Sequence, residues 1–154
     1  MKLFVTVGTS SFDSLFKKID EILDYKRDVE AIGQIGAGKY KPRNFRKIFK
    51  FTKNIRKYYE WADLIVAHGG AGTLYDILRF NKKAIVIPNR MAVEEHQIEL
   101  VTELYRLGYI FKGDLERLPQ QLDECLKYEF KPYKIESGWR IYSIIDKYIR
   151  SVIV

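Results

Sequence analysis

The residues best suited to bind a ligand follow an apolar run over residues 64–67, near the middle of the chain. Glycine lets backbone N–H groups approach a ligand closely, and the start of the helix that follows carries a positive partial charge. The pattern therefore indicates a phosphate or diphosphate site, although a tight turn that needs glycine only for packing is an alternative. The spacing matches neither the Walker A motif nor the dinucleotide-binding glycine motif. The residues of this turn are His68, Gly69, Gly70, Ala71, Gly72 and Thr73.

Asp76 follows Thr73 by three residues, so the two side chains can share one face of that helix. A carboxylate at this position could accept hydrogen bonds from the hydroxyls of a ribose. An acidic residue near a helix start is also favoured by the helix dipole, without any ligand. The sequence leaves both interpretations open.

A second turn of this kind opens the chain. Gly8, Thr9 and Ser10 follow the apolar segment 2–7 and precede a helical pattern. They offer hydroxyls and backbone N–H groups to an anion at the start of a helix. Ser10 or Ser11 acting only as the N-cap of that helix is the alternative.

A third polar loop leaves the apolar segment 84–87 after Pro88. Its side chains carry the donor and acceptor groups that suit sugar hydroxyls. Its acidic residues could instead complement the dipole of the helix that they begin. The chain has only two histidines and no D-x-D pair, so we expect no metal site and no cofactor. The candidate residues in this loop are Asn89, Glu95, His96 and Gln97.

These turns need a sheet to bring them together. Apolar runs of strand length alternate with helical patterns, which predicts βαβ units in a single doubly wound, Rossmann-like α/β domain with a parallel sheet. The ligand should then lie beyond the carboxyl ends of the strands. We expect strands at 2–7, 29–35, 46–51, 64–67 and 84–87, and helices at 12–23, 54–61, 69–80, 94–107, 115–128 and 137–152.

The bulk composition agrees with one globular domain over residues 1–154, because 47% of the residues are hydrophobic and 31% are charged. The single cysteine excludes an internal disulfide. No segment is apolar for long enough to span a bilayer, and the N-terminal apolar run is too short for a signal peptide. We therefore expect a cytoplasmic protein whose membrane association, if any, is peripheral.

The net charge of +7 is concentrated in one region. Between Ala31 and Tyr59 the chain has no acidic residue, whereas lysines and arginines recur from Lys39 to Lys57. Nucleic acid, an anionic membrane surface, a phosphorylated ligand or a merely solvated basic face could each explain this segment. It lacks a known nucleic-acid-binding motif, so we do not expect nucleic acid as a partner.

Taken together, these motifs resemble one known family, the glycosyltransferase family 28 C-terminal domain. The resemblance rests on residues 59–76, on 85–89 and on 95–97, and it extends to about Gly113. Two-domain enzymes of the MurG type and one-domain subunits of the Alg13 and PssE type share this pattern. The segments 5–10 and 34–36 are most similar to the one-domain group.

The resemblance implies that this chain is the nucleotide-sugar-binding half of a GT-B glycosyltransferase. It places Gly8, Thr9 and residues 68–73 at the donor diphosphate, and Asp76, where many relatives have Glu, at the ribose. It places the backbone of Phe51 and Thr52 at the uracil, and His96 and Gln97 at the donor sugar. Ser10, Asn89 and Glu95 complete the expected binding set.

An inverting sugar transfer needs a general base near the acceptor hydroxyl. The sequence offers no convincing candidate, and His68 is the only local alternative. The resemblance therefore implies a membrane-anchored partner, an Alg14-like or PssD-like subunit that binds a lipid-linked acceptor. The donor would be a UDP-sugar, either UDP-GlcNAc or a UDP-hexose or UDP-hexuronate. A non-catalytic, nucleotide-sugar-binding regulatory module is the alternative function.

The C-terminal helix expected over about residues 137–153 could dock this partner. Apolar side chains fall on one face at helical spacing. Packing of this face on the domain's own core is the alternative. The residues of the face are Ile141, Ile144, Ile145, Tyr148, Ile149 and Val152.

Overall fold

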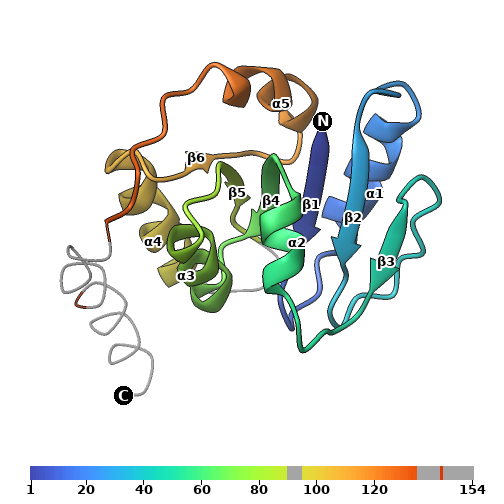
Figure 1. The fold of residues 1–154 in the computed structure, drawn as a ribbon, viewed down its shortest axis with the longest axis horizontal. Coiled ribbons are helices and arrows are strands. Elements are labelled where there is room, and N and C mark those ends of the chain that lie inside the picture. The colour runs from blue at the N-terminus through green and yellow to red at the C-terminus, as the bar shows by residue number, and fades with distance from the viewer. Residues whose placement is uncertain (90–94, 135–142, 144–154) are drawn as a thin grey trace.

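A six-stranded parallel sheet forms the centre of the molecule (Figure 1). The structure is a computed structural model that describes residues 1–89, 95–134 and 143. The strand order is β3-β2-β1-β4-β5-β6, and each neighbouring pair is parallel. The direction of winding reverses between β1 and β4, which is where doubly wound sheets bind their ligands. The strands are β1 (Lys2–Thr6), β2 (Glu30–Gln34), β3 (Lys47–Phe49), β4 (Leu64–His68), β5 (Ala84–Ile87) and β6 (Phe111–Lys112).

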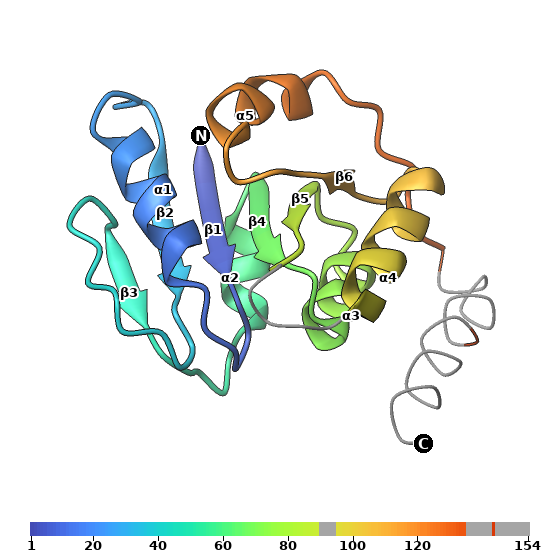
Figure 2. The ribbon, with the colours of Figure 1, turned by 180° about the vertical axis from the view of Figure 1, so that it is seen from behind.

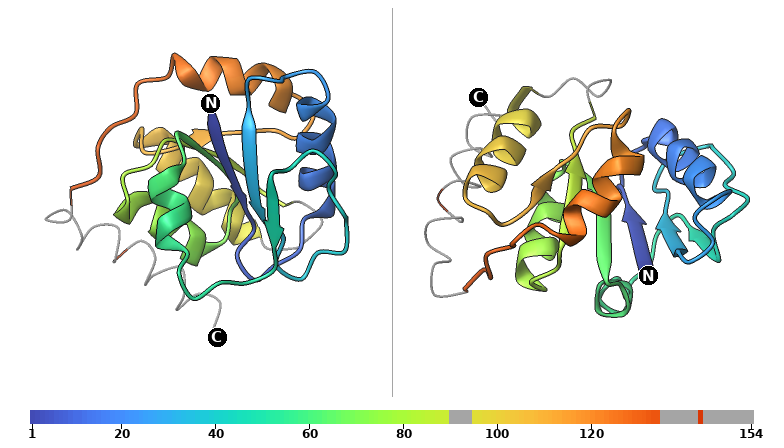
Figure 3. Two further views of the ribbon diagram at one scale, coloured as in Figure 1. Left: turned by 45° about the vertical axis from the view of Figure 1, so that its right-hand side comes forward. Right: turned by 90° about the horizontal axis from the view of Figure 1, so that it is seen from above.

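Helices cover both faces of the sheet (Figure 2). The buried side chains of α1 and α5 join one hydrophobic cluster, and those of α2, α3 and α4 join the other. Figure 3 shows the helices separated by the sheet from two further directions. The helices are α1 (Asp13–Leu23), α2 (Arg56–Trp61), α3 (Ala71–Arg79), α4 (Glu95–Arg106) and α5 (Leu118–Leu126).

The central strands are buried on both faces, as their continuous apolar runs predict. Because side chains alternate along a strand, Leu3 and Val5 of β1 enter the cluster with α1, while Phe4 enters the cluster with α2 and α3. In β4, Val66 likewise enters the cluster with α1, and Ile65 enters the cluster with α2 and α3. This two-sided burial fixes the register, so Thr6 lies beside Gln34 on one side and Ala67 on the other.

The structure differs from the sequence-based expectation most clearly at β6 and at the start of α5. It contains β6, which we did not expect, because a strand of two residues leaves no periodic signal. The helix expected from residue 115 begins only at Leu118, with a proline in its first turn. The helix expected over 137–153 lies outside the described residues. Within the part of the chain that is described, no helix is long and apolar enough to cross a membrane.

Candidate functional site

A cavity of about 670 Å³ opens at the carboxyl ends of β1, β2 and β4. The turns after β1 and β4, the first part of α3 and the segment between β3 and α2 all contribute to its wall. The structure thus brings together residues from distant parts of the sequence. The candidate residues that line this cavity are Gly8, Thr9, Ser10, Thr52, His68, Gly70, Ala71, Gly72, Thr73, Asp76 and Gln97.

The turns after β1 and β4 touch each other at Gly8. Gly8 has a φ of +57°, which an L side chain rarely adopts. A Cβ at this position would lie 3.2 Å from Thr73 Oγ1 and 3.6 Å from His68 Cε1. Glycine is therefore required here both for the backbone conformation and for the close approach of the two turns.

The N-terminus of α3 points into the cavity. Gly70 is the N-cap residue and makes no side-chain capping bond, and Gly70, Ala71 and Gly72 all line the wall. A Cβ on Gly72 would meet no atom within 4 Å, so this position faces open space. The unpaired N–H groups and positive partial charge of a helix start favour an anion at this place.

No lysine or arginine is among the described residues that line the cavity. Any anion bound there would be stabilised by the start of α3 and by neutral donors from hydroxyl and amide groups. Among residues 39–57, the basic segment of the sequence, only Thr52 and Ile55 line the cavity. The charges of this segment are exposed elsewhere, where Lys47 and Lys57 lie over the ring of Tyr58 and lower its pKa.

Asp76 provides the one carboxylate in the described wall of the cavity. It lies beyond the first turn of α3, which contains no acidic residue. The effect of the helix dipole falls off within the first turn, so the dipole does not explain this position. Burial raises the pKa of Asp76, and the charge of Arg79 opposes this in part. Burial, followed by the charge of Asp76, also raises the pKa of the neighbouring Tyr59 hydroxyl.

The turn after β1 uses part of its donor capacity internally. Gly8 N–H donates to Thr6 Oγ1 over 3.2 Å, and Ser10 N–H donates to the carbonyl of Val7 over 3.0 Å. The N-cap of α1 is Phe12, with no side-chain capping bond, so neither Ser10 nor Ser11 acts as the N-cap that we considered. Thr9 and Ser10 are exposed and line the cavity.

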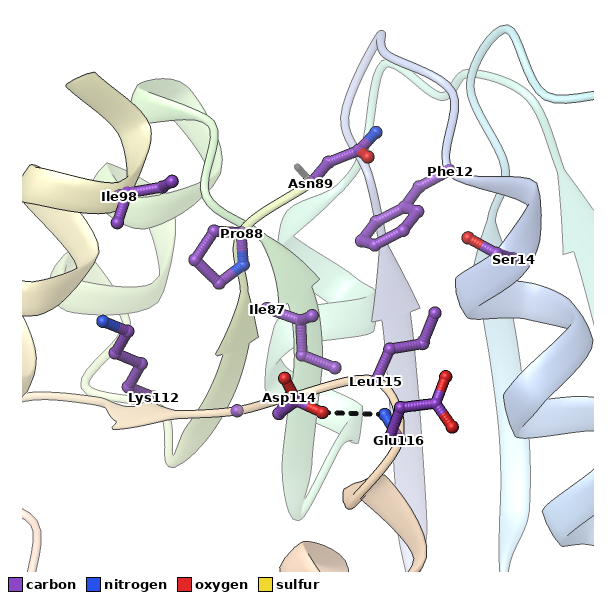
Figure 4. A pocket seen from close by; sticks show the side chains of 11 residues that line it. Phe12, Ser14, Ile87, Pro88, Asn89, Ile98, Lys112, Asp114, Leu115 and Glu116 are labelled. Atoms are coloured by element: carbon purple, nitrogen blue, oxygen red, sulfur yellow. Dashed lines mark hydrogen bonds between the residues drawn. The ribbon is translucent and has the colours of Figure 1, made fainter. Parts of the chain in front are cut away.

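Four of the candidate residues fall elsewhere or are described only in part. Gly69 packs against α4, where a Cβ would lie 2.9 Å from Val101 Cγ2. Asn89 lines a second cavity of about 260 Å³ beside Pro88 and Phe12 (Figure 4). Its Nδ2 donates to the Ser11 carbonyl over 3.2 Å. Glu95 and His96 begin α4, and only their backbone is described.

Other residues of the wall were not expected from the sequence. Gln34 was part of the resemblance but was given no role, although its place beside Thr6 at the carboxyl end of adjacent parallel strands could have identified it. Tyr59 and Tyr75 lie on helices, where the sequence pattern predicts that an aromatic residue packs in the hydrophobic core. The residues of the wall that the sequence did not indicate are Thr6, Gln34, Ile55, Tyr59 and Tyr75.

The residues described contain no group of three or more His, Cys, Asp and Glu side chains arranged to hold a metal ion. The wall combines a helix start, several hydroxyls, one carboxylate and amide groups. This set of groups can bind a phosphorylated ligand that also carries vicinal hydroxyls, as a ribose does.

A parallel sheet in this order, with a ligand-sized cavity where the winding reverses, defines the doubly wound class of nucleotide-binding domains. The model of the glycosyltransferase family 28 C-terminal domain matches residues 2–140, and the chain belongs to this family. The resemblance inferred from the motifs is thereby confirmed.

Relatives from several species share one name, UDP-N-acetylglucosamine transferase subunit ALG13. The chain is 30% identical over 122 residues to the UDP-N-acetylglucosamine transferase subunit ALG13 of Mus musculus, covering 71% of this chain and 10% of that protein. It is 31% identical over 121 residues to the Homo sapiens protein of the same name, covering 71% and 11%. The chain thus spans about a tenth of the length of these two relatives.

Solved structures share the fold. An NMR structure of ALG13 superposes with a TM-score of 0.63 at 21% identity, covering 93% of this chain and 94% of that one. The crystal structure of Acinetobacter baumannii MurG gives a TM-score of 0.66 at 20% identity, covering 82% of this chain and 42% of that one. The Rossmann-like α/β fold expected from the sequence is therefore confirmed.

Proposed function

We propose that this chain binds a UDP-sugar and forms the donor half of a two-component inverting glycosyltransferase. The observation that carries the proposal is the meeting of Gly8, Thr73 and the start of α3 at one point of the cavity wall, where the sheet changes its direction of winding. A diphosphate fits this point because the helix start and nearby hydroxyls supply donors. Membership of the family and the naming of relatives as UDP-N-acetylglucosamine transferase subunits support UDP-GlcNAc as the first donor to test.

In the proposed pose, the rest of the donor spreads from the diphosphate along the wall. Asp76 accepts hydrogen bonds from the ribose hydroxyls, and the backbone at Thr52 meets the uracil. The start of α4, with His96 and Gln97, meets the donor sugar, and Ser10 and Glu95 remain expected contributors. When the acceptor oxygen attacks the anomeric carbon, the bond to the diphosphate breaks and its electron pair leaves with UDP. The start of α3 stabilises that charge without a metal ion.

The acceptor proton needs a base that this wall does not clearly supply. Asp76 is assigned to the ribose, and His68, at the end of β4, is the histidine of the described wall. We therefore propose that a partner completes the site, an Alg14-like or PssD-like subunit that is anchored in the membrane and presents a lipid-linked acceptor. This chain would then be cytoplasmic and peripheral to the membrane through that partner. The naming of the relatives as subunits supports this arrangement.

Two measurements test the proposal. Calorimetry should show that the chain alone binds UDP and UDP-GlcNAc but not GDP. Sugar transfer to a lipid-diphosphate-linked GlcNAc should occur only when the proposed membrane-anchored partner is added. Absence of UDP binding would remove the proposed function altogether.

The shortage of a base also fits a second function, a nucleotide-sugar-binding regulatory module. That module would bind UDP-sugar with the same groups and would show no transfer with any membrane subunit. Retained UDP-GlcNAc binding together with no turnover in the reconstituted pair would favour it over the transferase subunit.

A further inference from the structure

A chain of hydrogen bonds links the turn after β1 to the end of β2. Gly8 N–H donates to Thr6 Oγ1 over 3.2 Å, and the Thr6 hydroxyl donates to Gln34 Oε1 over 2.8 Å. Thr6 is 1% exposed and Gln34 is 8% exposed, and both line the cavity. The two side chains meet because Thr6 and Gln34 are register partners in adjacent parallel strands.

This chain of bonds fixes which end of the Gln34 amide faces the ligand. A hydroxyl has one proton, and here that proton goes to Gln34 Oε1 while the oxygen accepts from Gly8. The amide oxygen is thus held against Thr6, and the NH₂ group is the end left for the cavity. The buried side chain therefore presents a donor at a fixed position.

The position of this donor is near the expected diphosphate. Gly8, at the other end of the hydrogen-bond chain, is the residue whose Cβ would lie 3.2 Å from Thr73 Oγ1 at the start of α3. Because the described wall contains no lysine or arginine, neutral donors carry a large share of the stabilisation of any anion there.

We infer that Gln34 is a diphosphate-binding residue, whose amide NH₂ donates to a phosphate oxygen and whose orientation is set by Thr6. The inference deepens the proposed function and rests on it. Thr6 is a positioning residue in this arrangement, since it acts on the ligand through Gln34 and Gly8. The assignment gives the cavity a donor from β2, a strand to which the sequence analysis gave no binding residue.

The test is Gln34→Glu, which keeps the shape and the acceptor for Thr6 but replaces the NH₂ donor by an oxygen. In calorimetry at pH 8, UDP affinity should fall by about tenfold to a hundredfold, the scale of a hydrogen bond to a charged group. Affinity for uridine, which has no phosphate, should stay within about twofold. As the pH is lowered, the introduced carboxyl becomes protonated and regains a donor, so the loss of UDP affinity should shrink.

Two controls separate this contact from other effects. Gln121→Glu makes the same change at another buried glutamine, whose Oε1 accepts from Asp114 N–H outside the cavity, and should leave UDP affinity unchanged. Gln34→Met is uncharged and should also weaken UDP binding. A loss with Gln34→Glu alone would mean that only the added charge matters, and would overturn the hydrogen bond.

A measurement on the unaltered protein keeps the inference testable if the variants do not fold. The ¹⁵N side-chain amide signal of Gln34 should shift on titration with UDP and remain in place with uridine. Equal losses of UDP and uridine affinity in the variant would overturn the assignment, and so would an amide signal that does not shift when UDP is added. If the unaltered protein binds no UDP, the proposed function fails instead, so the two failures are distinguishable.

Discussion

Gly8 and Thr73 face each other across the point where the sheet changes its direction of winding, so that a Cβ on Gly8 would lie 3.2 Å from Thr73 Oγ1. One residue follows β1 and the other belongs to α3, after β4. Their contact makes a single surface from two turns that are far apart in the sequence. The shape of the cavity therefore depends on the absence of a side chain at residue 8.

Gly8→Ala should lower both stability and UDP affinity. Its φ of +57° strains an L residue by about 1–2 kcal/mol, and the new methyl group displaces the Thr73 hydroxyl. Gly108→Ala is the matched control, since Gly108 has a φ of +82° and lies outside the cavity, and the atoms nearest to an added Cβ belong to the flexible Lys131 side chain. Thermal denaturation should show a lower melting temperature for both variants. Calorimetry should show a loss of UDP affinity only for Gly8→Ala. Equal UDP affinity in both variants would contradict this account of the turn.

Gly70 and Gly72 should respond differently to alanine although both line the cavity. A Cβ on Gly70 would lie 2.3 Å from His68 Nε2, so Gly70→Ala must displace that ring. A Cβ on Gly72 meets no atom within 4 Å, and alanine is favoured over glycine in a helix by up to about 1 kcal/mol. Urea denaturation should therefore show Gly70→Ala destabilised by about 1–3 kcal/mol and Gly72→Ala as stable as the unaltered protein or more so. The opposite order would show that His68 does not occupy the position described.

The central strands and their turns carry strong local signals in the sequence. Apolar runs of buried strands and glycines at strand ends are periodic or punctuated features, so β1, β4 and their turns were located to within a residue or two. The two residues of β6 carry no such feature, and its pairing with β5 is set by tertiary structure. Local sequence can place an element only when that element is long enough to show its period.

In the candidate site, too, some residues are marked by local sequence and others only by tertiary structure. Residues that stand beside glycine in a turn, such as Thr9 and Thr73, were identified because the turn itself is visible in the sequence. Gln34 was not identified, because its relevance depends on strand order, which puts β2 beside β1 at the cavity. Gly69 and Asn89 were expected in this wall because of their neighbours, but one packs against Val101 and the other bonds to Ser11.

Asp20→Ala should destabilise the protein without weakening UDP binding. Asp20 is 2% exposed, and its carboxylate accepts from Tyr40 Oη–H over 2.9 Å and from the backbone N–H groups of Arg43 and Asn44. Alanine leaves these donors without their acceptor, so urea denaturation should show a loss of roughly 2–4 kcal/mol. Asp24→Ala is the control, since its exposed carboxylate accepts one bond from Asn44 Nδ2. A weakened UDP affinity of folded Asp20→Ala would show that this loop reaches the cavity after all.

Asp76→Asn should stabilise the ligand-free protein at neutral pH and weaken its binding of UDP. Because burial raises the pKa of Asp76 from 3.8, the folded state holds this proton more tightly than the unfolded chain does. The carboxyl therefore costs stability as the pH rises from 3.8 through the raised pKa, and the cost persists above it. Asparagine has no charge to bury. The melting temperature of Asp76→Asn should therefore exceed that of the unaltered protein at pH 7, and the two melting temperatures should converge near pH 3.

The ribose contact should be lost in the same variant, because an uncharged amide is a weaker acceptor than a carboxylate. Calorimetry at pH 7 should show a loss of roughly 1–3 kcal/mol in UDP binding, whereas Glu129→Gln, at an exposed position outside the cavity, should show none. A higher melting temperature with unchanged UDP affinity would remove Asp76 from the binding site while leaving its burial intact. A gain in stability together with a loss of affinity is what a half-buried carboxylate held ready for a ligand requires, since the ligand's hydroxyls then replace the water that folding removed.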